Sequence, residues 1–298
     1  MLINLYEKLP EKLRRNSPQF LKEMYAKSSV FLRKMLIYSH FWIKDESVDE
    51  WFRDKKIFFI LSIGRSGTKW LADLLNKDPR ALVVHEPFIE AIPHQKAFHN
   101  PREAERYILK FRKKEIYVRI RKLDIDIYGE VNSFLRRHCE TLKKAFPSAI
   151  ILHLVRDGRS VVRSMYSRET MLPNAYDTKY IYPKPDDPYY KKWSNMTRFE
   201  KLCWYWAVEN QYLYECCKGK IIQFEKILSD YRYFREKILQ PLGLRIPKKI
   251  WEKAVKMPKN PSAYYKLPHW REWNQWMKEK FEEICGDIMR KCGYELSW

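Results

Sequence analysis

Short apolar runs alternate with amphipathic stretches through the middle of the chain. The runs have the length of buried strands and lie at 57–61, 82–84, 149–155 and 221–224. Between them, apolar positions recur at helical spacing after residue 68 and at 102–111, 132–145, 161–166, 199–217 and 226–239. Strands that alternate with helices predict an α/β fold with a central parallel sheet flanked by helices on both faces.

The two ends of the chain follow a different pattern, which predicts two domains. Residues 1–55 are interpreted as a basic helical N-terminal extension, because the first 44 residues carry nine Lys or Arg against three acids. This extension is either a helical arm packed on the body or a surface that docks an anionic membrane or a partner. Residues 56–298 form the second domain, which ends in a helical part.

Composition excludes several classes of protein. With 45% hydrophobic residues the chain can bury a core, so it does not have the composition of a disordered protein. Its apolar runs are far shorter than the ~20 residues of a membrane span, and we expect a cytoplasmic protein that at most contacts a membrane peripherally through residues 1–44. Six cysteines without a C-x-x-C pair are interpreted as reduced and mostly structural.

The charge balance points to an anionic partner. The chain has 58 Lys and Arg against 37 Asp and Glu, a formal net charge of +21. Nucleic acid, acidic lipid, nucleotide and acidic polysaccharide all fit this charge. Glycine is scarce, with 8 in 298 residues, so the positions that keep it are informative.

Two of these glycines lie in a loop between the first predicted strand and the helix after it. The loop reads Gly64-Arg65-Ser66-Gly67-Thr68. Such a turn gathers backbone N–H groups and the positive end of the helix around one point, which predicts an anion site. The ATP-binding G-x-x-x-x-G-K-[ST] pattern is not met, because Thr68, Lys69 and Trp70 follow Gly67. A kinase or ATPase is therefore disfavoured.

A second segment repeats this arrangement after the strand predicted at 149–155. Arg156 stands at the end of that strand, and Ser164 lies eight residues further on, within the next predicted helix. An arginine in a strand-to-helix turn is weak evidence by itself, since it could be an ordinary surface charge. The two segments together form a more specific pattern.

In this pair of segments the sequence resembles the PAPS-dependent sulfotransferase family. Ser-Ile-Gly-Arg-Ser-Gly-Thr-Lys-Trp-Leu, from Ser62, is similar to that family's 5′-phosphosulfate loop, and Leu-Val-Arg-Asp-Gly-Arg-Ser-Val-Val-Arg-Ser, ending at Ser164, is similar to its 3′-phosphate motif. The resemblance extends over 56–168 and more weakly to about 243. Two departures are Lys69, where the family commonly has a second Thr or Ser, and Gly158 in place of a proline.

The resemblance implies a P-loop-like fold and sulfuryl transfer from PAPS (3′-phosphoadenosine-5′-phosphosulfate) to an acceptor hydroxyl, with PAP as product and no metal. Arg65 would supply positive charge where the leaving oxygen becomes negative, and Lys69 is a second candidate. The residues implied to bind the donor are Arg65, Ser66, Gly67, Thr68, Lys69, Trp70, Arg156 and Ser164.

The acceptor hydroxyl needs a base, and two adjacent residues are candidates. Glu86, twenty-one residues after Arg65, is similar to the glutamate of carbohydrate and tyrosyl-protein sulfotransferases at the same interval. His85 is the alternative, because cytosolic-type relatives use histidine. Neighbours on a strand point to opposite sides, so we expect only one of the two to face the site. An N-capping or surface role for Glu86 remains open.

An acceptor with sugar rings is favoured by aromatic and basic residues. The region 171–198 is rich in Tyr and Trp, the tryptophans 270, 273 and 276 follow later, and a basic run spans 112–122. These suggest a glycan acceptor, although core packing and a solvated face explain them equally well. The competing hypothesis is a nucleic-acid- or nucleotide-binding protein without transferase activity. It is disfavoured because no nucleic-acid-binding motif is present, so we expect no nucleic acid as partner.

Overall fold

A computed structural model describes residues 42–88, 90–173, 175–257 and 265–298, together with isolated positions between 24 and 40. Most of the basic N-terminal extension therefore lies outside the described residues, as does most of the loop expected at 258–268. Three of the described positions in the extension are aromatic and exposed, namely Phe31, Tyr38 and Trp42.

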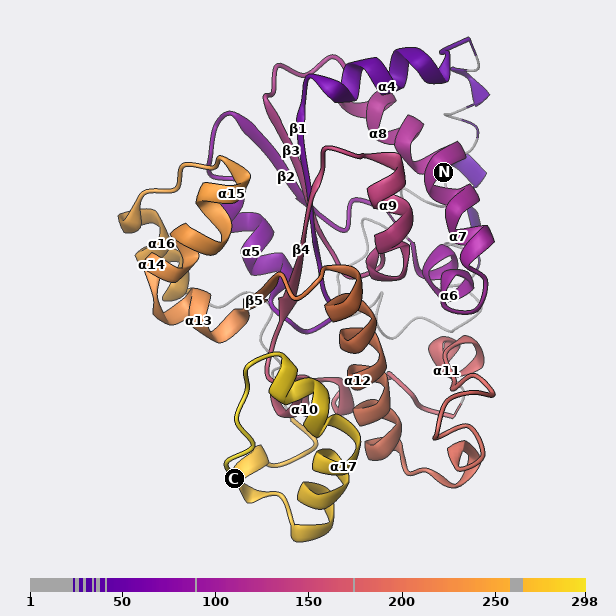
Figure 1. Cartoon of the computed structure of the whole chain (residues 1–298), viewed down its shortest axis with the longest axis vertical. Coiled ribbons are helices and arrows are strands. Elements are labelled where there is room, and N and C mark those ends of the chain that lie inside the picture. The colour runs from indigo at the N-terminus through magenta and orange to yellow at the C-terminus, as the bar shows by residue number, and fades with distance from the viewer. Residues whose placement is uncertain are drawn as a thin grey trace.

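Five parallel strands form the centre of the fold, and four of them lie at the apolar runs of the sequence. They are β1 (Lys56–Leu61), β2 (Ala81–His85), β3 (Ile127–Asn132), β4 (Ile150–Val155) and β5 (Ile221–Gln223). Their order in the sheet is β2-β3-β1-β4-β5, and every neighbouring pair is parallel (Figure 1). The prediction of an α/β fold with a central parallel sheet is confirmed.

Strand β3 was not predicted, and the helix expected at 132–145 begins later. The strand holds Gly129 and Glu130 in its middle, and both are buried, which breaks the apolar run that marks the other strands. Gly129 is needed because a Cβ there would lie 2.0 Å from the Phe58 ring on the neighbouring strand. Glu130 is neutralised by Arg112, 18 residues earlier in the chain. Neither reason is visible in the local sequence.

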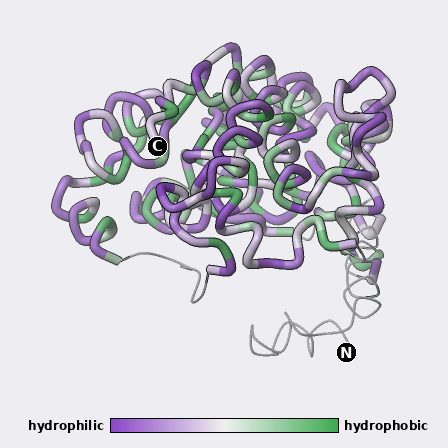
Figure 2. The backbone as a smooth tube through the Cα atoms, turned by 90° about the horizontal axis from the view of Figure 1, so that it is seen from below, coloured by the Kyte–Doolittle hydropathy of each residue, from purple (hydrophilic) through white to green (hydrophobic). Residues whose placement is uncertain are grey.

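Helices cover both faces of the sheet (Figure 1). One face carries α5 (Thr68–Leu75) and the group α13 (Phe224–Ser229), α14 (Tyr231–Phe234), α15 (Gln240–Leu242) and α16 (Lys248–Val255). The other carries α4 (Asp45–Arg53), α7 (Pro101–Tyr107), α8 (Lys113–Ile120) and α9 (Cys139–Ala145). Helix α6 (Ala91–His99) packs against α7. Apolar residues gather toward the middle of the molecule (Figure 2). Burying these two apolar faces provides the main stabilisation of the sheet.

A third layer packs beyond the ends of β4 and β5. It consists of α10 (Gly158–Tyr166), α12 (Arg198–Cys216) and α17 (Gln275–Lys291) around a separate cluster of buried side chains. Two tryptophans of this cluster, Trp206 and Trp273, are almost completely buried. Trp276 is 40% exposed, so the tryptophans at 270, 273 and 276 do not form one uniform face. The region 171–198 is mostly irregular, and its described residues include two short helices, α11 (Tyr176–Tyr180) and the 3-10 helix η3 (Trp193–Asn195).

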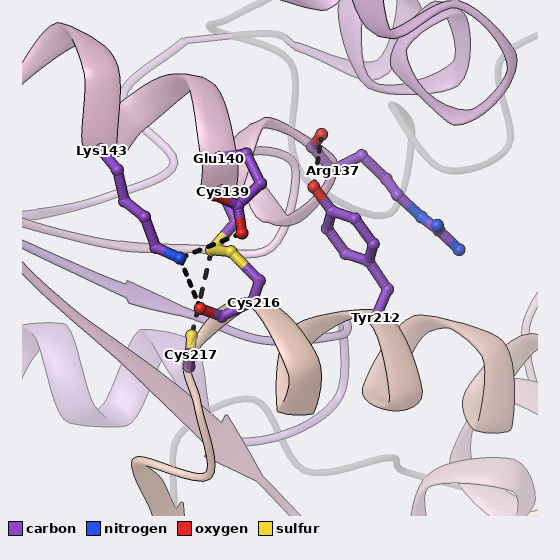
Figure 3. The surroundings of a disulfide bond; sticks show 7 residues. All are labelled: Arg137, Cys139, Glu140, Lys143, Tyr212, Cys216 and Cys217. Atoms are coloured by element: carbon purple, nitrogen blue, oxygen red, sulfur yellow. Dashed lines mark hydrogen bonds and ion pairs between the residues drawn. A yellow bond between two sulfur atoms is a disulfide. The ribbon is translucent and has the colours of Figure 1, made fainter.

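The expectation of reduced cysteines is wrong for one pair. Cys139, at the start of α9, and Cys216, at the end of α12, form a disulfide bond (Figure 3). Cys217 lies beside it, with its Sγ 4.0 Å from that of Cys139, and Lys143 donates a hydrogen bond to the Cys216 carbonyl. Spacing along the chain gave no sign of the bond, because 77 residues separate its ends. Since disulfides persist mainly in oxidising compartments, the cysteines no longer support a cytoplasmic location.

No helix in the described part of the chain is long and apolar enough to cross a membrane.

Candidate functional site

Most of the predicted site residues lie at the carboxyl edge of the sheet. Strands β1 and β4 are neighbours, with Leu61 opposite His153, so the segments that follow these strands leave the sheet side by side. Strands β2 and β3 lie on one side of β1, whereas β4 and β5 lie on the other, so the strand order reverses between β1 and β4. Ligands of open α/β sheets bind at the carboxyl ends of the strands where the order reverses in this way. This edge is therefore where the topology favours a binding site.

The first loop, residues 62–67, connects β1 to α5. Ser62 anchors it to the neighbouring strand, because its Oγ donates a 2.6 Å hydrogen bond to the Leu154 carbonyl. Gly67 ends the loop with a φ of +81°, and a Cβ there would overlap the Phe224 ring. Arg65 also has a positive φ, of +73°. Glycine at 67 is thus required both by backbone conformation and by the space that Phe224 leaves.

Within this loop one buried hydroxyl has no partner. Ser66 is fully buried, and its Oγ makes no hydrogen bond to any residue in the described ranges. A Cβ added at Gly64 would meet nothing within 4 Å, so the loop borders open space at that position. Buried polar atoms are normally paired. An unpaired hydroxyl at the start of the eight-residue helix α5 therefore fits a ligand with oxygen atoms, such as a phosphate.

The second loop begins with Arg156 and leads into α10, and it contacts the first loop directly. Arg156 Nη1 donates a 2.9 Å hydrogen bond to the Arg65 carbonyl. Arg65 Nε in turn donates a 2.9 Å bond to Ser164 Oγ on α10. The structure thus brings together three of the predicted donor-binding residues, and Arg65 links the two loops.

Sequence reasoning assigned no role to the residues that hold the second loop. Glu225, on α13 directly after β5, accepts hydrogen bonds from the Asp157 amide at 3.1 Å and from the Tyr294 hydroxyl at 2.6 Å. Its Oε1 lies 4.0 Å from Arg156 Nε. Burial raises the pKa of the Glu225 carboxyl, although its hydrogen bonds partly oppose this. The C-terminal residue Tyr294 could not be connected to this loop from the sequence.

The Arg156 side chain keeps part of its surface open to solvent. It is 30% exposed, and its guanidinium carbon lies 5.4 Å from the centre of the Phe224 ring. Phe224 therefore supports both the first loop, beneath Gly67, and the cation of the second. A cation that is supported from one side and open on the other is suited to bind an anion.

His85 and Glu86 lie on the same side of the chain, so the expectation that they diverge is wrong. His85 Nε2 lies 3.7 Å from Glu86 Oε1. The cause is the backbone of Glu86, whose φ of +44° ends the alternation of the strand. His85 Nε2 also makes a 2.9 Å hydrogen bond with Thr68 Oγ1. Both candidate bases are thus adjacent to the first loop.

His85 and Glu86 differ in their electrostatic surroundings and in their hydrogen-bond partners. Burial lowers the pKa of His85, and the charge of Lys69 lowers it further against the opposing effects of Glu86 and Asp73. This lowered pKa favours the neutral form of His85. Glu86 Oε1 accepts hydrogen bonds from Ser133, from its amide at 3.2 Å and from its hydroxyl. Ser133 was expected inside a helix and was not identified as a site residue.

Two of the predicted donor-binding residues do not join this group. Lys69 is 53% exposed and pairs with Asp73 at 2.8 Å, one turn along α5. Trp70 is buried, and its Nε1 donates to the Ala254 carbonyl at 3.0 Å. The indole packs edge-on against Phe224, with 5.9 Å between ring centres. Trp70 thus supports the first loop indirectly, by packing against Phe224, which contacts Gly67.

The basic run at 112–122, which was expected to contact a glycan acceptor, begins with a buried residue. Arg112 is fully buried and donates to Glu90 at 2.7 Å and to both oxygens of Glu130 at 2.8 Å. Arg33, from the N-terminal extension, pairs with Glu115 beside them at 2.6 Å. We call these five residues the ionic network. The interpretation of Arg112 as an acceptor-binding cation is wrong, because its charge is neutralised inside the protein.

The next two cations of the basic run, Lys113 and Lys114, are largely buried. Lys113 pairs with Asp49 of α4 at 2.5 Å, while Lys114 donates to the Ile43 carbonyl, so both cations join α8 to the extension. In the irregular region, Tyr182 and Tyr190 are exposed. No group of three His, Cys, Asp or Glu placed to hold a metal is present among the described side chains.

Comparison with known proteins finds similarity among solved structures. No protein-family model matches the chain, and no curated protein matches it. Among solved structures, the chain is similar to one described as the crystal structure of a sulfotransferase from Alicyclobacillus acidocaldarius. The TM-score is 0.45 at 15% sequence identity, and the match covers 80% of this chain and 94% of that chain.

Proposed function

We propose that this chain is a PAPS-dependent sulfotransferase, which moves a sulfuryl group from PAPS to an acceptor hydroxyl. The contact between the two loops carries the proposal. Arg156 reaches the backbone of Arg65, and the Arg65 side chain reaches Ser164, so the two motifs that resemble the family meet at one sheet edge. A donor with negative charge at both ends needs one cationic position for each end, and the two loops each supply an arginine, Arg65 and Arg156.

The residues present fit such a donor. Arg156 and Ser164 would hold the 3′-phosphate, because a guanidinium with exposed surface and a hydroxyl can both donate to its oxygens. The first loop would hold the phosphosulfate end through the start of α5 and the hydroxyl of Ser66, which lacks a partner in the described part of the chain. Thr68 adds a second hydroxyl there.

The chemistry divides between a cation and a base. When bound, PAPS supplies a sulfuryl group whose bond to the phosphate oxygen breaks as the bond to the acceptor oxygen forms. Arg65 would supply positive charge for the oxygen that becomes negative, which is typically a large catalytic contribution. Lys69 is less suited to this role, because its ammonium pairs with Asp73 on the exposed side of α5.

Glu86 is the proposed base, which accepts the acceptor's hydroxyl proton. It is about one-fifth exposed and carries a carboxylate beside the first loop. His85 is its alternative, but its Nε2 is engaged with Thr68. We expect Glu86→Gln to reduce turnover by about 10²- to 10⁴-fold, the usual contribution of a general base. Near wild-type transfer by Glu86→Gln, together with loss of transfer in His85→Ala, would reverse the assignment.

A glycan is the proposed acceptor class. Exposed Tyr182 and Tyr190, in the irregular region between α10 and α12, offer flat apolar faces on which sugar rings can stack. The experiment is to incubate the protein and PAPS with glycans, tyrosine peptides and small phenols and to measure each acceptor by mass spectrometry. A gain of one SO₃ group on a glycan supports the proposal, and a gain on another acceptor corrects its class. No gain on any acceptor would count against sulfuryl transfer.

The competing hypothesis is a nucleic-acid- or nucleotide-binding protein without transferase activity, and its favouring observation is the net charge of +21. Retention on immobilised PAP at high salt distinguishes the two, because non-specific binding of nucleic acid weakens steeply as salt rises. Retention that survives high salt supports a built nucleotide site. Retention of DNA or RNA at the same salt, without retention of PAP, would favour the competitor.

A further inference from the structure

The carboxylate of Glu86 is held on one of its two oxygens. Its Oε1 accepts both the amide and the hydroxyl hydrogen of Ser133, whereas no hydrogen bond reaches Oε2 from the described residues. We propose that Ser133 is a positioning residue, which fixes Oε1 so that Oε2 faces the acceptor and takes its proton. The inference rests on the proposed function, because it gives a partner to the base assigned there.

Glu86 needs such a partner because its backbone is strained. Its φ of +44° lies in the left-handed region, which is unfavourable for residues with a side chain. This left-handed backbone conformation places the Glu86 side chain beside His85 and the first loop, rather than on the opposite face of the strand. Contacts from other segments must therefore stabilise this backbone position. Ser133, directly after the neighbouring strand β3, provides two of them.

Ser133 is itself in a fixed position. It follows β3 directly and is 6% exposed. Before it, Asn132 closes the turn by accepting the amides of Phe134 and Leu135 at 2.8 and 3.2 Å. After it, Arg136 Nη1 donates to the Ser133 carbonyl. These bonds hold the backbone on both sides of the donor, so its hydroxyl and amide have little freedom to turn away.

Arg136 is itself fixed by contacts with buried residues of α12, so the contacts that begin at Glu86 and Ser133 end in the core. It is buried, and its guanidinium reaches Glu209 at 2.8 Å and the Tyr205 hydroxyl on α12. Burial lowers the pKa of Arg136, but Glu209, Tyr205 and Glu86 raise it above its ordinary value. The negative charge of Glu86 thus acts on this cation through space. Arg136 fixes Ser133, and Ser133 fixes the base.

The experiment compares the steady-state kinetics of three variants. Ser133→Ala removes the hydroxyl donor and keeps the amide, so we expect kcat to fall by about 10- to 100-fold, as for a lost hydrogen bond to a charged group, with KM for PAPS unchanged. Ser133→Thr keeps the hydroxyl and restores most of kcat. The control is Ser229→Ala, at an exposed serine whose hydroxyl donates, among the described residues, to two carbonyls of its own helix α13, and it leaves kcat unchanged.

A double-variant cycle separates positioning from a general structural effect. If Ser133 acts through Glu86, then Ser133→Ala slows a Glu86→Ala enzyme by less than about twofold. An equal slowing in both backgrounds, or a Ser133→Thr enzyme as slow as Ser133→Ala, would overturn the proposal.

Urea unfolding of the same four proteins tests the contact without turnover. We expect Ser133→Ala to lower the unfolding midpoint less in the Glu86→Ala background than in the wild type, and equal decreases would contradict the contact. Failure of the proposed function is distinguishable, because the wild type would then transfer no sulfuryl group while the unfolding cycle still reports whether Ser133 holds Glu86.

Discussion

The ionic network and the pair of loops are both rich in charge, but they differ in how their cations are paired. In the network, Arg112 is fully buried and is neutralised by Glu90 and Glu130. At the loops, Arg156 is 30% exposed, and its carboxylate neighbour Glu225 is 4.0 Å away. A cation neutralised inside the protein stabilises the fold, whereas one with exposed surface and a distant counter-charge can bind an anion. A net charge of +21 does not distinguish the two cases.

The largest effect is expected from breaking the network. Arg112→Met leaves two buried carboxylates without their cation, which should lower the free energy of unfolding by about 3–5 kcal/mol in urea titrations. PAP affinity of the folded fraction should not change. Arg112→Lys is the control, because it keeps the charge but loses the planar set of donors, and its loss of unfolding free energy should be intermediate. A loss below about 1 kcal/mol for Arg112→Met would show that the network is not what stabilises this side of the sheet.

Acid should weaken the same region. Burial lowers the pKa of His138, beside the network, from 6.5 to about 4, although Glu90 partly opposes this. The unfolded chain therefore binds a proton that the folded protein does not, and stability is lost as pH falls from about 6.5 towards 4. His138→Gln should reduce that dependence by up to about 1.4 kcal/mol per pH unit, measured by unfolding at several pH values. An unchanged slope would mean that His138 is already protonated in the folded protein.

At the loops, the same kind of substitution should affect binding instead of folding. Arg156→Ala should weaken PAP binding by about 10- to 100-fold in calorimetric titration, since a charge-assisted hydrogen bond is lost. Its unfolding free energy should change by less than about 1 kcal/mol. Arg232→Ala removes an equal charge from an exposed pair with Glu236 and is the matched control. Equal PAP affinity in the two variants would remove Arg156 from the donor site.

The smallest effect compares two buried serines of the first loop. Ser62 donates to the Leu154 carbonyl, so Ser62→Ala should lower the free energy of unfolding by about 0.5–1.5 kcal/mol. Ser66 makes no hydrogen bond within the described residues, so Ser66→Ala should leave stability unchanged and weaken PAP binding. Unfolding curves and PAP titrations of both variants check this. Loss of stability in Ser66→Ala, with unchanged PAP affinity, would place its hydroxyl in the fold rather than in the site.

The sequence alone was sufficient to predict the sheet class and the two loops. Four of the five strands are apolar runs, and glycine is scarce enough that Gly64 and Gly67 mark the first loop. Strand β3 could not be predicted, because Gly129 accommodates a ring from another strand and Glu130 is paired with Arg112. Both reasons are long-range contacts, which no local pattern encodes.

The fine geometry of the site depends on similar contacts. A strand's alternation predicts that His85 and Glu86 diverge, and only the left-handed backbone of Glu86 overrides it. Ser133 becomes a neighbour of Glu86 through the pairing of β2 with β3, while Cys139 meets Cys216 through the packing of α9 and α12. Local spacing identifies residue types, but the tertiary packing decides which of them meet.

A crystal structure of the protein with PAP tests the central claim most directly, since that claim is that one nucleotide spans both loops. The account predicts a 3′-phosphate bound by Arg156 and Ser164 and a 5′-phosphate at the backbone of residues 64–68, with Ser66 donating to one of its oxygens. A nucleotide bound elsewhere, or one that contacts only one of the two loops, would contradict it.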